Sequence, residues 1–180
     1  AKIWIESILN SQRENGNFGP SAESKGAQDF WPNMIALWIL QSYYEYTDDA
    51  RVIDFMTRYF HFQLSVPDEL FMRKSWQHYR GGDNLWSVAW LYSRTGDAKL
   101  LELADKIHRN TANWTKSTEL PTWHNVNVAQ GCREPATYYL FNDWYIFYCC
   151  IIISYNYIVT IKVFIFTFFR LYHHKFLTRI

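Results

Sequence analysis

Three short polar segments combine the residue types that proteins use to hold a sugar. They lie at residues 29–33 (DFWPN), 80–85 (RGGDNL) and 123–127 (WHNVN). The face of a tryptophan ring can stack on a sugar ring, while histidine, carboxylate and amide groups form directional hydrogen bonds. We therefore predict a carbohydrate as the binding partner, with the substrate-binding residues Trp31, Asp83, Asn84, His124 and Asn125.

Each segment also has a purely structural interpretation, which stays open for the first two segments. Pro32 suits the first turn of a helix, and Asp83 suits a helix N-cap. The glycine pair within residues 80–85 would let the backbone approach a ligand closely. Trp123 could be a core residue and His124 a cap, but a second polar cluster is expected on the same rim, so we favour binding there.

Acidic residues near these segments could supply the carboxyl pair of a glycosidase. Retaining enzymes place two carboxyl groups about 5 Å apart, and inverting enzymes leave more room for a water molecule. The candidates are Asp29, Asp83, Glu119 and Glu134. Because sequence spacing does not measure such distances, we assign no catalytic residue.

A pair of adjacent cysteines suggests a zinc site that we do not adopt. Cys149 and Cys150, followed by His173 and His174, contain the atoms of a Cys2His2 site. Neighbouring residues on a helix point about 100° apart, which suits capture of one ion poorly. No second cysteine pair accompanies them. We therefore predict no metal site in this chain and interpret Cys132 as a small packed residue.

The elements that must position the polar segments follow from an internal repeat. The sequence of residues 47–51 (TDDAR) recurs 48 positions later at 95–99 (TGDAK), and a weaker third copy lies at 142–143. Gly96 suits a helix C-cap and Asp97 a helix N-cap, so the motif predicts a tight turn between two helices. The repeat therefore predicts helical hairpins. We place the helices at residues 1–13, 33–46, 49–63, 84–94, 98–110 and 126–140.

Long connections separate the hairpins, at residues 14–32, 64–83 and 111–125. Because the turns within the hairpins are short, the long connections must emerge together at one rim. Loops of this length within a compact domain are usually functional. An open solenoid and a closed toroid of hairpins both fit the pattern, and the long loops favour the toroid. The fold class we predict is all-α.

The last part of the chain has a different composition. Every Gly, Pro, Asp and Glu lies within residues 1–143. We predict a helical domain over 1–143 and an apolar tail over 144–180, which we interpret as the product of a frameshift or an unspliced intron. A membrane anchor is the alternative, because residues 144–161 carry no formal charge and basic residues follow.

The net charge of +1 predicts no nucleic-acid partner. We expect no membrane partner unless the tail is a genuine anchor.

An ordered run of motifs resembles the catalytic domain of glycoside hydrolase family 127, the β-L-arabinofuranosidase-like proteins. The motifs are QRENGNFGP, DFWPNMIALWILQSYYEYT, RVIDFMTRYFHFQL, RGGDNLWSVAWLYSRTGD, LLELADKIHRNTANWT and WHNVNVAQGCREPATYY. The resemblance covers residue 2 to about 139 or 143. It implies an (α/α)6 toroid, of which this chain forms part, with the sugar on the rim of long loops.

The resemblance also implies retaining hydrolysis by a zinc-bound cysteine nucleophile and a glutamate acid–base. In the family, one glutamate and three cysteines, one of them the nucleophile, hold the zinc, which keeps the sulfur deprotonated. These groups follow the point at which this chain loses the family pattern. We therefore expect no cofactor in this fragment, although zinc is expected in the intact family enzyme.

The resemblance bears on individual site residues as well. His124 matches a family position that contacts the sugar, and Trp31, Asp83 and Asn84 fall at the corresponding helix entries. Better-known members have histidines near two of these entries, where this chain has Pro-Asn and Asp-Asn.

Two functional hypotheses follow. The first is a fragment of a glycoside hydrolase for L-arabinofuranosides or related plant glycosides, which keeps part of the sugar-binding rim and lacks the catalytic groups. The alternative is a helical-repeat binding module with a C-terminal membrane anchor.

Overall fold

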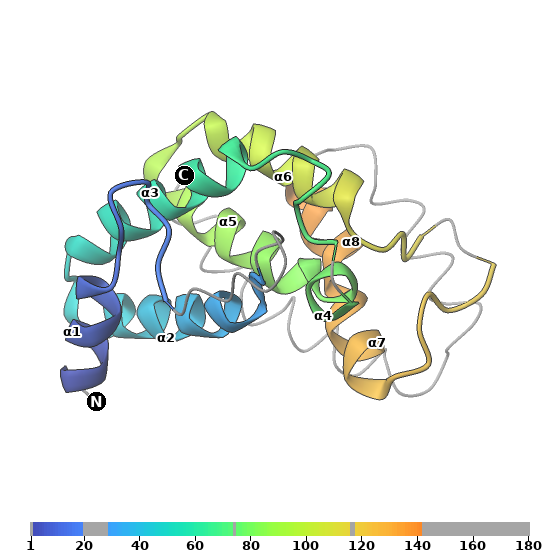
Figure 1. Ribbon diagram of the computed structural model, residues 1–180, viewed down its shortest axis with the longest axis horizontal. Helices are drawn as coiled ribbons and strands as arrows, with labels where there is room; N and C mark the ends of the chain where they lie inside the picture. Colours follow the sequence, from blue (N-terminus) through green and yellow to red (C-terminus); the bar gives the residue numbers. More distant parts are fainter. Residues whose placement is uncertain (1, 20–28, 74, 116–117, 142–180) are drawn as a thin grey trace. The chain divides into compact units, whose positions relative to one another are not determined.

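The computed structural model describes residues 2–19, 29–73, 75–115 and 118–141, all within one compact unit, Ala1–Phe141. In these ranges the regular structure is entirely helical (Figure 1). The elements are α1 (Lys2–Asn10), α2 (Trp31–Thr47), α3 (Arg51–Ser65), α4 (Ser75–Tyr79), α5 (Gly81–Thr95), α6 (Lys99–Asn110), α7 (Asn125–Gly131), α8 (Arg133–Tyr138) and the 3₁₀ turn η1 (Tyr139–Phe141). The all-α prediction is therefore confirmed over the described residues.

The two copies of the repeated motif form the same turn. Asp48 ends α2 with a φ of 53°, and Gly96 ends α5 with a φ of 63°, both in the left-handed region. In each copy the preceding threonine hydroxyl donates to the carbonyl four residues earlier, with distances of 2.8 and 3.0 Å. Asp97 Oδ1 then accepts from Lys99 N at 3.0 Å, so this side chain closes the turn one residue before Ala98, which is the N-cap of α6 in place of the predicted Asp97. The hairpin prediction is correct for both copies.

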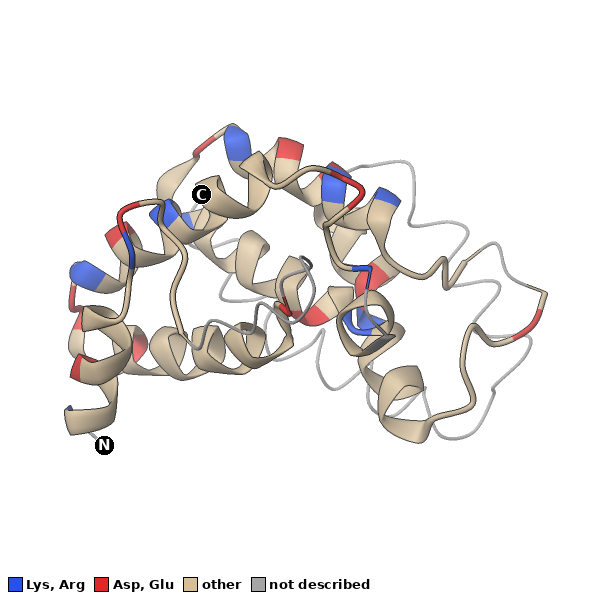
Figure 2. Cartoon of the chain, in the orientation of Figure 1, with Lys and Arg blue, Asp and Glu red and all other residues tan. Residues whose placement is uncertain are grey.

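The helices form two layers. Helices α2, α5 and α8 contact one another in that order, and α3 and α6 pack together against them. Side chains without exposed surface fill the space between the layers, among them Leu37, Leu40, Phe60, Leu85 and Leu103. Figure 2 shows Lys, Arg, Asp and Glu gathered on α3, α6 and the hairpin turns, while α2 is almost free of them. The layer that contains α2 and α5 is therefore the more apolar one.

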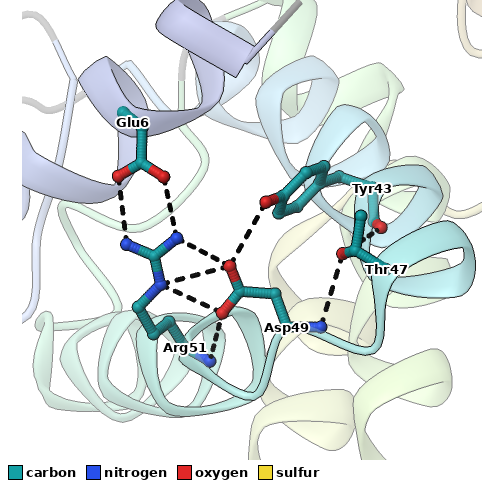
Figure 3. Close-up of polar contacts among 5 residues, drawn as sticks. All are labelled: Glu6, Tyr43, Thr47, Asp49 and Arg51. Atoms are coloured by element: carbon teal, nitrogen blue, oxygen red, sulfur yellow. Dashed lines mark hydrogen bonds and ion pairs between the residues drawn. The ribbon is translucent and has the colours of Figure 1, made fainter.

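Salt bridges join α1 to the first hairpin turn, which follows the C-terminal end of α2 (Figure 3). Arg51 Nη2 lies 2.8 Å from Glu6 Oε1 and 2.7 Å from Asp49 Oδ2. The Tyr43 hydroxyl donates to the same Asp49 oxygen at 3.3 Å. Hydrogen bonds from Arg51 hold the pKa of Asp49 low, at about 2. Because α2 has 17 residues, this turn lies about 25 Å from the beginning of α2.

The glycine pair at the beginning of α5 permits close packing within the protein itself. A Cβ atom on Gly82 would lie 2.5 Å from the backbone nitrogen of Glu134, and one on Gly81 would lie 2.2 Å from Thr111 Cγ2. These glycines therefore bring α5 against α8 and against the end of α6. Helix α5 begins at Gly81, three residues before the predicted start at about residue 84.

Other boundaries differ in ways that have local causes. The predicted helix at 126–140 is divided at Cys132 into α7 and α8. Pro135 has no N–H to donate to the helix ladder, which favours such a break. The short helix α4 lies where a loop was predicted. The third copy of the repeat and the apolar tail lie outside the described residues. Within the described ranges, no helix is both long enough and apolar enough to span a bilayer.

Candidate sugar-binding rim

The long connections meet around the side chain of Arg80. Its guanidinium carbon lies 4.3 Å from the ring centre of Trp31 and 4.4 Å from that of Trp76. Arg80 Nε donates to Asn127 Oδ1 at 2.8 Å. The rings of Trp76 and His124 are 5.2 Å apart and nearly perpendicular. We call these five residues the tryptophan–arginine cluster.

The cluster gathers residues from all three long connections and the helices that follow them. Trp31 begins α2, Trp76 lies in α4, Arg80 directly precedes α5, and His124 and Asn127 stand at the beginning of α7. Each α-helix that follows a long connection thus starts near the same place. The connections are also tied to one another, because Phe30 N donates to Gln77 Oε1 at 2.7 Å. Ring contacts between Phe30 and Phe71, at 5.3 Å, add to this link.

One side of the cluster faces solvent. Trp76 is 43% exposed, and His124 and Asn125 are exposed as well. Trp123 beside them is 78% exposed, which is unusual for so large an apolar ring. Arg80, by contrast, is only 6% exposed. The rim therefore presents aromatic rings at the surface above a buried cation, and burial lowers the pKa of Arg80.

The structure brings together Trp31 and His124 of the predicted residues, through Arg80 and Trp76. Asn125 is their surface neighbour as the first residue of α7. Asp83 and Asn84 lie one turn beyond Arg80, inside α5, and both are fully buried. The role of all five residues in binding a substrate stays a prediction.

Asp83 is a carboxyl group enclosed by protein. Its Oδ1 atom lies 3.0 Å from Arg133 Nη1, whereas its Oδ2 atom is buried and has no partner among the described residues. Burial raises the pKa of Asp83 to about 6, and the charges of Arg133 and Arg80 act in the opposite direction. Asp83 makes no side-chain hydrogen bond to a helix N-terminus, so it does not act as the cap of α5.

Asn84 points into the core between α5 and α3. Its amide nitrogen donates to Gln63 Oε1 at 2.7 Å, and its amide oxygen accepts from Gln63 Nε2 at 3.1 Å. This reciprocal amide pair uses the polar groups at the end of the side chain. The structure therefore does not bring Asn84 to the exposed side of the rim.

The acidic residues considered as a glycosidase pair occupy very different surroundings. Asp29 accepts from Trp31 N at 3.0 Å, and Glu119 is exposed. Glu134 is buried, and its Oε1 atom lies 2.7 Å from His108 Nδ1. Burial raises the pKa of Glu134, while the bond to His108 lowers it. Asp83 and Glu134 are thus the two buried members, each held by a basic side chain, and we assign neither a catalytic role.

The described residues do not fit the zinc centre that the resemblance implies. No group of three or more His, Cys, Asp and Glu side chains in these ranges could hold a metal ion. Burial raises the pKa of the Cys132 thiol, which opposes the thiolate form that a metal ligand requires. Cys149 and Cys150 lie outside the described residues.

Sequence reasoning missed the centre of the cluster. Arg80 stood in a segment chosen for Asp83 and Asn84, and Asn127 stood in one chosen for His124. Trp76 fell in a stretch predicted to be a loop. The spacing of Trp76 and Arg80, at i and i+4, would place both on one side of a helical turn and could have indicated their contact.

Comparison with known families gives one match. The model of the β-L-arabinofuranosidase, GH127 catalytic domain matches residues 1–146. The chain matches no curated protein and no solved structure.

Proposed function

Because the chain belongs to the glycoside hydrolase family 127 β-L-arabinofuranosidase catalytic domains, we propose that its rim binds L-arabinofuranosides or related plant glycosides. The membership covers residues 1–146 of 180. The resemblance assigns no residue of this chain to the catalytic glutamate or the zinc-binding cysteines of the family. The chain is then a sugar-binding part of a hydrolase and does not cleave the bond by itself.

The observation that carries this proposal is the meeting of two tryptophans and a histidine at one partly exposed rim. The exposed ring of Trp76 offers an apolar face on which the C–H side of a sugar can stack. His124 and Asn125 stand beside it with groups that can donate to or accept from sugar hydroxyls. Arg80 holds Trp31 and Trp76 at fixed positions through its contacts with both rings.

The roles of these residues are limited to binding and orientation. Asp83 and Glu134 are enclosed and paired with Arg133 and His108, respectively. The described residues do not fit a zinc centre, so we derive no step through a metal. A complete family enzyme would use zinc to keep its cysteine nucleophile deprotonated.

Binding to the full chain tests the proposal. Methyl β-L-arabinofuranoside is titrated into the unmodified chain and into Trp76→Ala, and binding is followed by changes in NMR chemical shift. An aromatic contact of this kind contributes about 0.5–1.5 kcal/mol, so we expect binding about 2- to 12-fold weaker in Trp76→Ala. Trp4→Ala is the matched control, because Trp4 is also exposed, at 76%, but belongs to α1.

Two results would contradict the proposal. The first is the absence of any saturable binding to the unmodified chain. The second is an equal loss in Trp4→Ala and Trp76→Ala, which would mean that the sugar does not recognise the rim. Hydrolysis of the arabinoside in a zinc-dependent reaction by the purified chain would disprove that the chain lacks catalysis.

A further inference from the structure

Arg80 is a buried cation whose charge is not matched by an ion pair. Its side chain makes one hydrogen bond, from Nε to Asn127 Oδ1 at 2.8 Å. Among the described residues, no carboxylate lies within ion-pair distance of Arg80, and none accepts a hydrogen bond from its Nη1 or Nη2 atom. Four of its five N–H donors are therefore left for another partner.

Burial of such a group is unfavourable without compensation. Only 6% of the surface of Arg80 is exposed. Burying a charge without an ion-pair partner costs free energy. The two indole rings recover part of this cost through cation–π contacts. They do so through the ring faces and leave the in-plane donors of the guanidinium unused.

The nearest carboxyl group does not replace the missing partner. Asp83 lies within the electrostatic reach of Arg80, but its hydrogen-bonded oxygen faces Arg133 at 3.0 Å. Burial, rather than Asp83, has the larger effect on the pKa of Arg80 and lowers it. A further negative charge beside Arg80 would therefore stabilise its charged form.

The terminal nitrogens of Arg80 are also within reach from outside. In the described ranges, several side-chain atoms are both completely enclosed and without a hydrogen-bond partner, and neither Nη1 nor Nη2 of Arg80 belongs to them. Because both atoms lack a partner, each must keep some solvent exposure. Trp76, which contacts Arg80, is 43% exposed, and His124 beside it is exposed. An anionic group that approaches Arg80 from solvent beside Trp76 would therefore meet these donors.

We propose that Arg80 binds a carboxylate on the ligand, so that the rim selects an acidic glycoside over its neutral counterpart. This inference rests on the proposed function and specifies its substrate class. A planar guanidinium offers two parallel N–H donors that match the two oxygens of a carboxylate. Sugar hydroxyls do not offer this geometry. Arg80 thus recognises the charge of the ligand beside the exposed Trp76 ring.

A matched pair of ligands tests the inference on the full chain. The neutral ligand is methyl β-L-arabinofuranoside, and the acidic one is the same glycoside with the C5 hydroxymethyl group replaced by a carboxylate. Hydrogen bonds to charged groups exceed neutral ones enough that we expect the acidic ligand to bind about 10-fold more tightly at low salt. The preference should fall as sodium chloride is added, because the attraction is screened.

Substitution identifies the responsible side chain. Arg80→Gln should remove the preference for the acidic ligand. Arg109→Gln is the control, because Arg109 is an exposed arginine of α6, and it should keep the preference. If Arg80→Gln does not fold, the Nε–H resonance of Arg80 in the unmodified chain decides instead. The acidic ligand should shift this resonance at saturation, and the neutral ligand should leave it within one line width.

The outcomes separate this inference from the proposed function. Equal affinity for both ligands would overturn the role of Arg80 and leave sugar binding intact. A preference that survives in Arg80→Gln, or an unshifted Arg80 resonance, would do the same. Failure of both ligands to bind would overturn the proposed function together with the inference.

Discussion

At the scale of single residues, Asp83 makes the folding stability depend on pH. Its pKa is about 6 in the folded protein because of burial, against 3.8 for the ordinary group. Between these values the folded state holds a proton that the unfolded state has lost. The stability that Asp83 contributes is therefore complete below about pH 4 and is lost as the pH rises through about 6.

Asp83→Asn tests this dependence. A shift of about 2 pKa units corresponds to at most about 3 kcal/mol. We expect the free energy of unfolding of the unmodified chain, relative to Asp83→Asn, to fall by up to that amount between pH 4 and 7. Urea unfolding at a series of pH values measures it. Glu134, whose pKa burial also raises, is present in both proteins and cancels. Parallel pH profiles would show that Asp83 does not titrate in this range.

Single residues also show what the sequence could and could not predict. The approach of Trp31 to His124 was predictable because each lies two residues before an expected helix, at the end of a long connection. The burial of Asn84 was not, because its partner Gln63 belongs to a different hairpin and only packing brings the two amides together. Arg80 was missed for the same reason, since two rings from distant segments define its position.

At the scale of elements, the two hairpin turns allow a reciprocal test. Gly96 has a φ of 63°, and a Cβ atom there would meet nothing within 4 Å. Gly96→Ala should therefore destabilise the protein only through backbone strain, by about 1 kcal/mol. Asp48 has the same conformation, with a φ of 53°. Asp48→Gly should relieve strain and stabilise the protein by a few tenths of a kcal/mol, because aspartate tolerates this region better than alanine.

Thermal and urea unfolding of the two variants measure these changes. Gly19→Ala is a useful contrast, because its φ is 75° but a Cβ atom there would also lie 3.0 Å from Asn33 Oδ1. It should destabilise the protein more than Gly96→Ala does. Equal stability of Gly96→Ala and the unmodified chain would show that the turn relaxes out of the left-handed region.

The hairpins were predictable because their signals are local. Threonine, a left-handed residue and aspartate follow one another in both copies, and the bonds that close each turn join residues no more than four apart. The start of α5 was not predictable from the same kind of signal. Glycine has a low helix propensity, yet Gly81 and Gly82 are the first two residues of α5, because Thr111 and Glu134 leave no room for a side chain.

At the scale of the whole molecule, the family match explains why an all-helical fold of hairpins was predictable from motifs. Ordered family motifs and a repeat of 48 residues both indicate paired helices. The surface left uncovered depends on packing and was not specified by the motifs. Helices α1 and α2 expose Ile3 at 84%, Trp4 at 76%, Ile35 at 44% and Ile39 at 48%.

This exposed apolar surface on α1 and α2 predicts self-association of the chain. Ile35 and Ile39 are one helical turn apart and therefore lie on one side of α2, and contiguous apolar surface of this kind promotes association. Replacing both by glutamine should shift sedimentation toward the monomer at equal concentration, with little change in helical circular dichroism. Glu102→Gln is the control, because Glu102 is exposed on α6. An unchanged size distribution in the Ile35→Gln, Ile39→Gln variant would show that association, if present, uses another surface.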